Sequence, residues 1–249
     1  MKRVEWRELP NIDDPELVGC CSAVQNARNS LLDLLRDALG QLSNHPVTLP
    51  TRCALAGLAR IGEAVLSAEV LCQKNRVRDA AILILSIFEL RLDLQYIALD
   101  TSRATTWIEH AEERVKPWSV KKQLRAVYAN SDELETQREL YRKYSMVKHC
   151  NPVGGDLAFP MTVTVDTIGL DSEKSNSRWI RIHTFGLAWH ILEASKAACE
   201  IFRDQGLRVG AHLEGIQHSV DELSRLNEVH IVRTLKSARS CADDSGGDT

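Results

Sequence analysis

Residues 77 to 99 are apolar almost all the way round a helical projection, and this segment constrains the fold more than any other. A helix of this kind must be covered by protein on most sides, because water would otherwise contact its apolar faces. It is not a membrane span, since Glu89, Arg91 and Asp93 interrupt it, and each charge at the centre of a bilayer would cost about 2.5 to 3.5 kcal/mol. We therefore predict a helix at the centre of a bundle and no membrane partner.

Apolar residues recur at helical spacing on both sides of this segment. Glycine and proline account for 20 of 249 residues, about 8% against an ordinary usage of about 12%, which favours helices over hairpins. Ser131, followed by two acidic residues, is the predicted N-cap of one helix, and Pro117 is expected in the first turn of another. The predicted class is all-α, with an aliphatic core because aromatic residues make up only 5% of the chain. Helices are predicted at about 17–42, 51–74, 102–115, 131–150, 179–203 and 207–237, and from 117 onward.

One part of the chain, residues 153–176, lacks helical spacing. Within it, residues 161–166 alternate and are β-branched, which predicts a loop or a short β-hairpin inserted between helices. The polar residues 240–249 are predicted to form a disordered tail. Because no linker divides the chain, we predict one helical domain over 1–239, with a core at about 50–152 and C-terminal helices over 178–238.

The cysteines and the N-terminus indicate a cytoplasmic protein. The seven cysteines are odd in number and scattered, without metal-ligand spacing, which is typical of reduced thiols. The charged N-terminus lacks the apolar stretch of a signal peptide. Acidic residues surround His110, but Glu109 directly precedes it and no Glu-x-x-His motif supports a two-metal site, so we predict neither a metal ion nor a cofactor. The net charge of -3 gives no general attraction to nucleic acid, and RNA binding would need a local basic patch.

Ser86, Glu89, Asp93 and Tyr96 share one face of the central helix, because they are spaced at i, i+3, i+7 and i+10. We call these four residues the polar stripe. A carboxylate on a buried helix is costly unless it is paired, so the two acids predict hydrogen-bond donors on a neighbouring helix or at a wet cleft. The alternative is that this face of the helix points to solvent.

The best source of donors is the helix predicted at 131–150. Tyr141, Ser145 and His149 follow one another at four-residue steps, and Arg142 lies seven residues before His149, so all four are expected on one side of the helix. Contact between this side and the polar stripe would satisfy both acids and orient the imidazole of His149. We therefore predict that the two helices pack together through these side chains.

These two helices resemble those of bacterial HEPN families (higher eukaryotes and prokaryotes nucleotide-binding), and most closely a branch known only as a domain of unknown function. That branch pairs a helix of the form A-x-x-L-x-R-S-x-x-E with a later helix of the form Y-x-x-x-S-x-x-x-H, often followed by Asn-Pro. Here the segment AILILSIFE, from Ala81 to Glu89, carries the Ser and the Glu of the first as Ser86 and Glu89, with Leu85 where the family has arginine; the second runs from Tyr141 to His149. The resemblance covers about residues 50–152 and implies a HEPN-like helical bundle.

In HEPN ribonucleases an Arg-x4-6-His motif cleaves RNA without a metal ion, often across a homodimer interface. The resemblance therefore implies that Arg142 and His149 are catalytic, in stress response or phage defence. Histidine can exchange a proton with the 2′-hydroxyl or the leaving oxygen, and arginine can stabilise charge on the phosphoryl group. The site implied in this way also includes Tyr141, Ser145, Glu89 and Asp93.

The Arg-x4-6-His spacing is not specific by itself. It also occurs at Arg103/His110, Arg178/His183 and Arg225/His230. Only the Tyr-Ser-His frame selects Arg142 and His149 as the candidate pair.

A local run of basic residues near Trp107 and Trp118 supplies a patch that could follow a phosphate backbone. A solvated helix face explains such a run equally well. The predicted RNA-binding residues are Lys116, Lys121, Lys122, Arg125 and Lys148, with Arg114 beside them.

A second function class is a non-catalytic helical interaction or sensor module, such as a toxin–antitoxin or defence-system partner. In that case the Tyr-Ser-His side is a structural hydrogen-bonded network. The amphipathic residues 207–235 carry an apolar stripe that could close the bundle or bind another subunit. The expected partners are therefore RNA, a second copy of the chain in a homodimer, or a helical protein.

Overall fold

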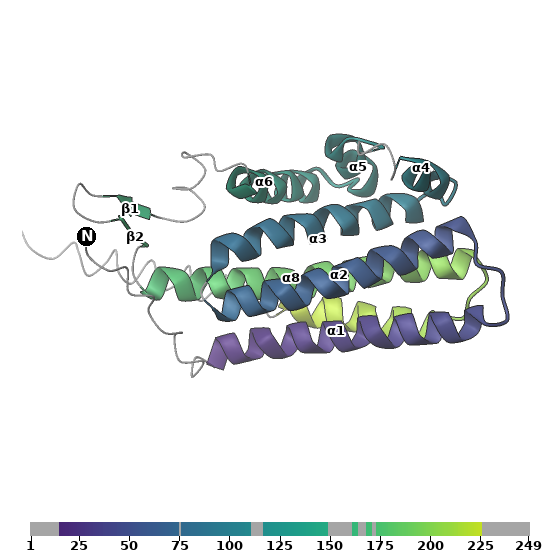
Figure 1. Cartoon of the computed structure of the whole chain (residues 1–249), viewed down its shortest axis with the longest axis horizontal. Helices are drawn as coiled ribbons and strands as arrows, with labels where there is room; N and C mark the ends of the chain where they lie inside the picture. Colours follow the sequence, from purple (N-terminus) through teal and green to yellow (C-terminus); the bar gives the residue numbers. More distant parts are fainter. Residues whose placement is uncertain are drawn as a thin grey trace, which may run out of the picture.

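Helices make up most of the chain that the structure describes (Figure 1). The computed structural model describes residues 15–74, 76–110, 117–148, 161–163, 168–170 and 173–225. The helices are α1 (Pro15–Leu42), α2 (Leu49–Gln73), α3 (Val77–Ala98), α4 (Arg103–Glu109), α5 (Val120–Val127), α6 (Ser131–Lys148) and α8 (Glu173–Asp204), followed by a helical segment at 210–225. The predicted all-α helical bundle is confirmed. None of the helices in the described ranges is long and apolar enough to cross a bilayer.

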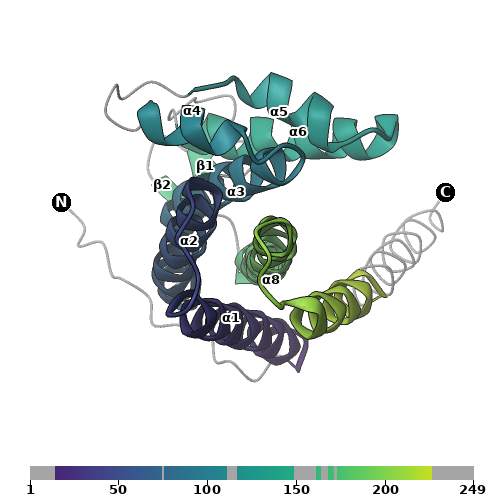
Figure 2. The same ribbon diagram turned by 90° about the vertical axis from the view of Figure 1, so that its right-hand side faces the viewer.

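The helices form an inner bundle and an outer layer, which are best seen end-on (Figure 2). The inner bundle consists of α1, α2, α3 and α8, and the segment at 210–225 lies beside α1. The outer layer consists of α4, α5 and α6, which lie on the other side of α3. The predicted central helix, α3, is therefore covered from both sides. It shares the central place with α8, which packs against α1, α2 and α3.

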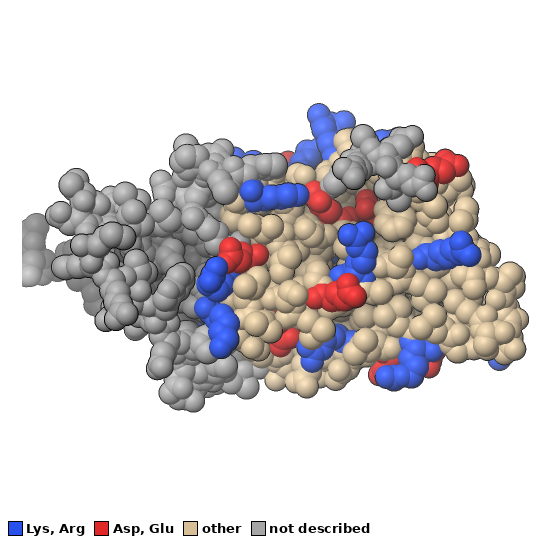
Figure 3. All heavy atoms as spheres, viewed as in Figure 1, with Lys and Arg blue, Asp and Glu red and all other residues tan. Residues whose placement is uncertain are grey.

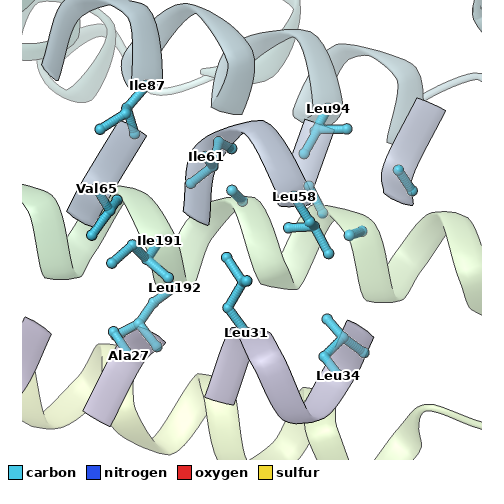
Figure 4. Close-up of a cluster of buried hydrophobic side chains, with 14 of the residues drawn as sticks. Ala27, Leu31, Leu34, Leu58, Ile61, Val65, Ile87, Leu94, Ile191 and Leu192 are labelled. Atoms are coloured by element: carbon cyan, nitrogen blue, oxygen red, sulfur yellow. The ribbon is translucent and has the colours of Figure 1, made fainter. Parts of the chain in front are cut away.

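The core is aliphatic, as the low aromatic content predicts. Figure 4 shows leucine, isoleucine and valine side chains from α1, α2, α3 and α8 meeting in one cluster. Each fully buried side chain of this size contributes about 1.5 to 3 kcal/mol relative to an exposed one. Members of the cluster include Ala27, Leu31, Leu34, Leu58, Ile61, Val65, Ile87, Leu94, Ile191 and Leu192.

In the outer layer one predicted helix start is wrong, that of α5, and one predicted N-cap is wrong, that of α6, which does begin at Ser131 as predicted. Helix α5 begins at Val120 rather than Pro117, since the Ser119 hydroxyl accepts a hydrogen bond from the backbone N–H of Lys122 at 3.3 Å. Helix α6 is capped by Asn130 rather than Ser131: the Asn130 side chain accepts from the N–H of Asp132 at 2.9 Å. In both cases the cap satisfies an N–H that has no partner within the helix.

Other boundaries differ from the prediction at the ends of longer segments. Helix α4 ends at Glu109, and residues 111–116 of the helix predicted at 102–115 lie outside the described residues. Helix α8 begins at Glu173, within the insertion predicted at 153–176. In that region β1 (Met161–Val163) pairs antiparallel with β2 (Ile168–Leu170). The predicted tail, 240–249, lies outside the described residues.

The end of α8 turns the chain back along α1. Gly206 has a φ of 85°, its N–H bonds to the carbonyl of Arg203, and the N–H of Leu207 bonds to the carbonyl of Phe202. This pattern terminates a helix at a left-handed residue, which glycine adopts without strain. The Gln41 side chain then bonds both backbone groups of Arg208, at 2.7 and 3.0 Å.

Replacing Gly57 with alanine is expected to destabilise the fold by about 1 to 2 kcal/mol, because overpacking outweighs the gain in helix propensity. A Cβ atom at Gly57 on α2 would lie 2.9 Å from a methyl carbon of Leu94 on α3. At Gly19 on α1 nothing lies within 4 Å, so Gly19→Ala is expected to stabilise by about 0.5 to 1 kcal/mol. Urea unfolding of both variants tests the pair, and stabilisation by both would contradict the close approach of α2 and α3.

Candidate functional site

One predicted contact between α3 and α6 is present. The Tyr141 hydroxyl donates to Glu89 Oε1 at 3.3 Å, and the Tyr141 ring packs 5.7 Å from the Phe88 ring. Burial raises the pKa of Tyr141, and the neighbouring Glu89 raises it further. The phenol therefore remains a hydrogen-bond donor to Glu89 at neutral pH.

Asp93 contacts the other part of the outer layer, so its predicted contact with α6 is wrong. Its Oδ2 accepts from the indole N–H of Trp107 at 3.1 Å, and its Oδ1 accepts from Trp118 Nε1 at 3.1 Å and Gln123 Nε2 at 2.6 Å. Trp118 and Gln123 are buried. We call these four residues the Asp93 cluster, which joins α3 to α4, to α5 and to the chain just before α5.

The remaining residues of the polar stripe also do not face α6. The Tyr96 ring is buried, stacks edge-on with Trp118 at 5.0 Å, and is covered by the Arg103 guanidinium at 3.9 Å. Ser86 donates to the carbonyl of Ile82 in its own helix. The alternative expectation, a stripe that faces solvent, is also wrong, because Ser86, Glu89 and Asp93 are only partly exposed and Tyr96 is buried.

On α6 the four predicted site residues do not share one side. Arg142 lies on the outer side and binds Glu139 with two hydrogen bonds, at 2.8 and 3.0 Å, which raise the pKa of Arg142 and lower that of Glu139. Tyr141 faces inward and Ser145 is half-buried. His149 lies outside the described residues. The helix therefore separates an inner tyrosine side from an outer basic side.

Tyr144, which the sequence prediction left out, anchors α6 on α8. It is buried, and its hydroxyl lies 3.4 Å from His183 Nδ1. Burial lowers the pKa of His183 to about 4, so this imidazole is neutral at physiological pH. The signal for Tyr144 was its position three residues after Tyr141, which places both tyrosines toward the inner bundle.

Arg91 is the largest fully buried side chain among the described residues, and the sequence prediction did not assign it to a site. It is completely buried, donates from Nη2 to Gln137 Oε1 at 3.1 Å, and lies between the rings of Phe88 and Trp189. Leu85, which occupies the family's arginine position, is buried in the aliphatic core. A charged residue inside an apolar helix was a signal for such a cluster, because it requires partners.

Exposed cations gather on α5 and on the C-terminal half of α6. Residues 117–131 and 140–148 each contain three Lys or Arg and no acidic residue. All six of these cations are exposed, because Gln123 and Leu124 form the buried side of α5, and Tyr144 and Val147 are the buried residues in this half of α6. Lys and Arg side chains also protrude at the upper edge of the molecule, near the place of α5 (Figure 3). The six are Lys121, Lys122, Arg125, Arg142, Lys143 and Lys148, and we call them the basic face.

The two tryptophans near the basic face do not present their rings to it freely. Both indole N–H groups bind Asp93, and Trp118 is only 8% exposed. The expected RNA-binding residue Lys116, like its neighbour Arg114, lies outside the described residues. The basic face therefore offers charge rather than aromatic stacking.

The described residues contain no group of three or more His, Cys, Asp or Glu side chains that could hold a metal ion. None of the five described cysteines forms a disulfide. Burial raises the pKa of Cys53 to about 11 and those of Cys72 and Cys199 to about 12, so these three remain thiols of low reactivity. Comparison with protein-family models, with curated proteins and with solved structures finds no match to this chain.

Proposed function

We propose that this protein acts on RNA through the basic face of α5 and α6, as a metal-independent endoribonuclease of the HEPN type in stress response or phage defence. The observation that supports this most directly is the C-terminal half of α6. Arg142, Lys143 and Lys148 are exposed on it, no acidic residue occurs in residues 140–148, and His149 is the next residue of the chain. The arrangement combines a phosphate-binding surface with a group that can transfer protons.

The proposed reaction is transfer of the RNA phosphoryl group to the neighbouring 2′-hydroxyl. His149 removes the proton of that hydroxyl as it attacks phosphorus, and the bond to the 5′-oxygen breaks as a proton is returned to it. The products are a 2′,3′-cyclic phosphate and a 5′-hydroxyl. Arg142 stabilises the charge on the phosphoryl oxygens, for which a phosphate must replace Glu139 as its partner. The lysines of α5 hold the adjoining backbone.

The test is cleavage of a labelled single-stranded RNA in the presence of EDTA. We expect His149→Ala to reduce the rate about 100-fold or more, and Arg142→Ala to reduce it about 10- to 100-fold because one cation on the phosphoryl group is lost. The matched control is Arg36→Ala, since Arg36 on α1 is also exposed and also pairs with an acid three residues away, Asp33. It is expected to cleave at the wild-type rate.

Equal cleavage by the wild type, His149→Ala and Arg142→Ala would contradict this assignment of the site. Absence of cleavage by the folded wild type would contradict the ribonuclease proposal. Circular dichroism of each variant separates loss of the reaction from loss of the fold.

The second candidate is a non-catalytic interaction or sensor module, and the inner side of α6 favours it. Tyr141 contacts Glu89, and Tyr144 is buried against His183, so these side chains attach α6 to the inner bundle. In that case the wild type does not cleave RNA, and Tyr144→Phe lowers stability. A protein partner would then replace RNA as the ligand of the exposed surface.

A further inference from the structure

The Arg91 guanidinium is the least compensated charge among the described residues. Its side chain is completely buried, and neither Nε nor Nη1 has a hydrogen-bond partner. The third nitrogen, Nη2, donates to a neutral amide, Gln137. The rings of Phe88 and Trp189 hold the guanidinium between them, with distances of 4.6 and 4.5 Å to the ring centroids. Because arginine is charged at every physiological pH, the Nε and Nη1 donors of this buried cation have no hydrogen-bond acceptor.

His190 lies close enough to Arg91 to be affected by its charge, and it also lacks hydrogen-bond partners. It is completely buried, and neither Nδ1 nor Nε2 has a hydrogen-bond partner. Its ring packs edge-on against both Phe88, at 5.5 Å, and Trp189, at 5.3 Å. Burial lowers the pKa of His190, and the charge of Arg91 lowers it further. The neutral ring therefore offers one N–H donor and one nitrogen acceptor.

The nearby carboxylate does not neutralise Arg91. Glu193 on α8 is partly buried, and its Oε2 accepts from the Gln95 side chain at 3.0 Å. No ion pair joins Arg91 to an acid of the described residues. Burial raises the pKa of Glu193, whereas the charge of Arg91 acts in the opposite direction, so the two groups interact at a distance rather than in contact.

We propose that Arg91 and His190 form an internal binding site for a small anion that presents negatively charged oxygen acceptors, such as a small carboxylate or inorganic phosphate. Such a ligand can accept hydrogen bonds from Arg91 Nε and Nη1 and from the N–H of His190. Charge-assisted hydrogen bonds of this kind are the strong ones, and they are strongest where water is excluded. The aromatic rings on either side position the guanidinium for them.

The site lies where three helices from both layers meet. Arg91 belongs to α3, Gln137 to α6, and His190 to α8. A ligand that binds here stabilises the attachment of the outer layer to the inner bundle, because Gln137 and Arg91 share that contact. The ligand must enter by local separation of α6 from α3 and α8, so we expect slow association. The proposal does not depend on RNA cleavage.

The test is the thermal midpoint, Tm, of the full chain in sodium acetate, sodium phosphate and sodium chloride at equal ionic strength. Acetate and phosphate also stabilise proteins in general, so the informative quantity is the difference between the wild type and Arg91→Met. We expect a saturable rise in Tm for the wild type and an apparent Kd at least about tenfold weaker for Arg91→Met, because two charge-assisted hydrogen bonds are lost. The stronger of the acetate and phosphate responses identifies the ligand chemistry, and chloride reports the general salt effect.

Arg91→Met is expected to fold, since replacing a buried charge by an apolar side chain of similar volume is often tolerated. The control is Arg28→Met, because Arg28 is half-buried and already paired with Glu69 at 3.1 Å; it should keep the wild-type response. A second variant, Glu193→Gln, keeps the Arg91 cation. Because it removes a competing negative charge, we expect it to lower the apparent Kd for the anion several-fold.

Identical anion responses in the wild type and Arg91→Met would overturn the proposal. So would a loss of the response in Glu193→Gln, because removing a competing negative charge must strengthen, and not abolish, the binding of an anion at Arg91. If Arg91→Met does not fold, calorimetric titration of the wild type and Glu193→Gln with acetate and phosphate is the test: tighter binding by Glu193→Gln supports the proposal, and no binding to the wild type, or no tightening in Glu193→Gln, overturns it.

Discussion

Replacing Asp93 with alanine is expected to lower the free energy of unfolding by about 3 to 5 kcal/mol. The carboxylate accepts three hydrogen bonds, from Trp107, Trp118 and Gln123. Alanine leaves all three donors without an acceptor, and those of Trp118 and Gln123 are buried. Each buried donor left without a partner costs about 1 to 3 kcal/mol.

Asp93→Asn separates the contribution of side-chain size to stability from the contribution of the hydrogen bonds. Asparagine keeps the size of the side chain but replaces one acceptor oxygen with an NH2 group, which would face at least one N–H of the Asp93 cluster. We expect it to cost about half as much as alanine, about 1.5 to 3 kcal/mol. Urea unfolding followed by circular dichroism gives the free energy for each variant.

The matched control is Asp79→Ala, on the same helix. Asp79 is 44% exposed and pairs with Arg76 at 2.8 Å, and exposed ion pairs contribute about 0 to 1 kcal/mol. A cost for Asp93→Ala no larger than that of Asp79→Ala would mean that the Asp93 cluster does not hold the outer layer on α3.

Acidification from pH 7.5 to 5 is expected to destabilise the protein by about 2 kcal/mol through His183 alone. In the unfolded chain His183 binds a proton near pH 6.5, whereas in the folded protein burial lowers its pKa to about 4. The unfolded state therefore binds more protons between these values. Stability that is fully present above pH 6.5 is lost as the pH falls to 4, by a total of about 3 kcal/mol.

His190 contributes in the same direction, because its pKa is also lowered by burial. Glu193 acts in the opposite direction: burial raises its pKa, so its contribution decreases as the pH rises. The double variant His183→Asn/His190→Asn removes both histidine contributions, and the side-chain amide introduced by His183→Asn keeps an acceptor or donor for Tyr144. We expect the double variant to show a clearly smaller loss of stability between pH 7.5 and 5.

The control for the acid experiment is His218→Asn. His218 is 68% exposed in the segment at 210–225, so its replacement is expected to leave the pH dependence unchanged. Urea midpoints at pH 7.5, 6.5, 5.5 and 5 at constant ionic strength provide the measurement. A double variant as acid-sensitive as the wild type would show that carboxyl groups, and not the buried histidines, cause the loss.

Much of the helical architecture could be predicted because apolar spacing is a local property. The start of α5 and the N-cap of α6 could not, since the first depends on Ser119 acting as the cap two residues beyond Pro117, and the second on Asn130 acting as the cap in place of Ser131. Neighbouring residues of similar N-capping propensity compete for that role, and the local sequence does not show which of them takes the capping conformation.

Part of the candidate site followed from the same reasoning. Glu89 needed a donor, and Tyr141 on a helix of suitable spacing provides it. The partners of Asp93 were missed because they lie on α4, on α5 and just before α5, whereas the spacing of polar residues pointed to donors on α6. The spacing on α6 also did not show that Arg142 would face outward to Glu139, since one residue along a helix changes the direction of a side chain by about 100°.

The central segment at 77–99 shows where prediction from sequence ends. By itself the sequence determined that this segment is a helix, that it is covered on both sides, and that its charged residues need partners. Only the tertiary structure decided that Asp93 faces α4 and α5 whereas Arg91 faces α6 and α8. The physical reason is that periodicity defines the faces of a helix, but the neighbour of each face is chosen by the packing of segments that lie up to about a hundred residues away in the chain.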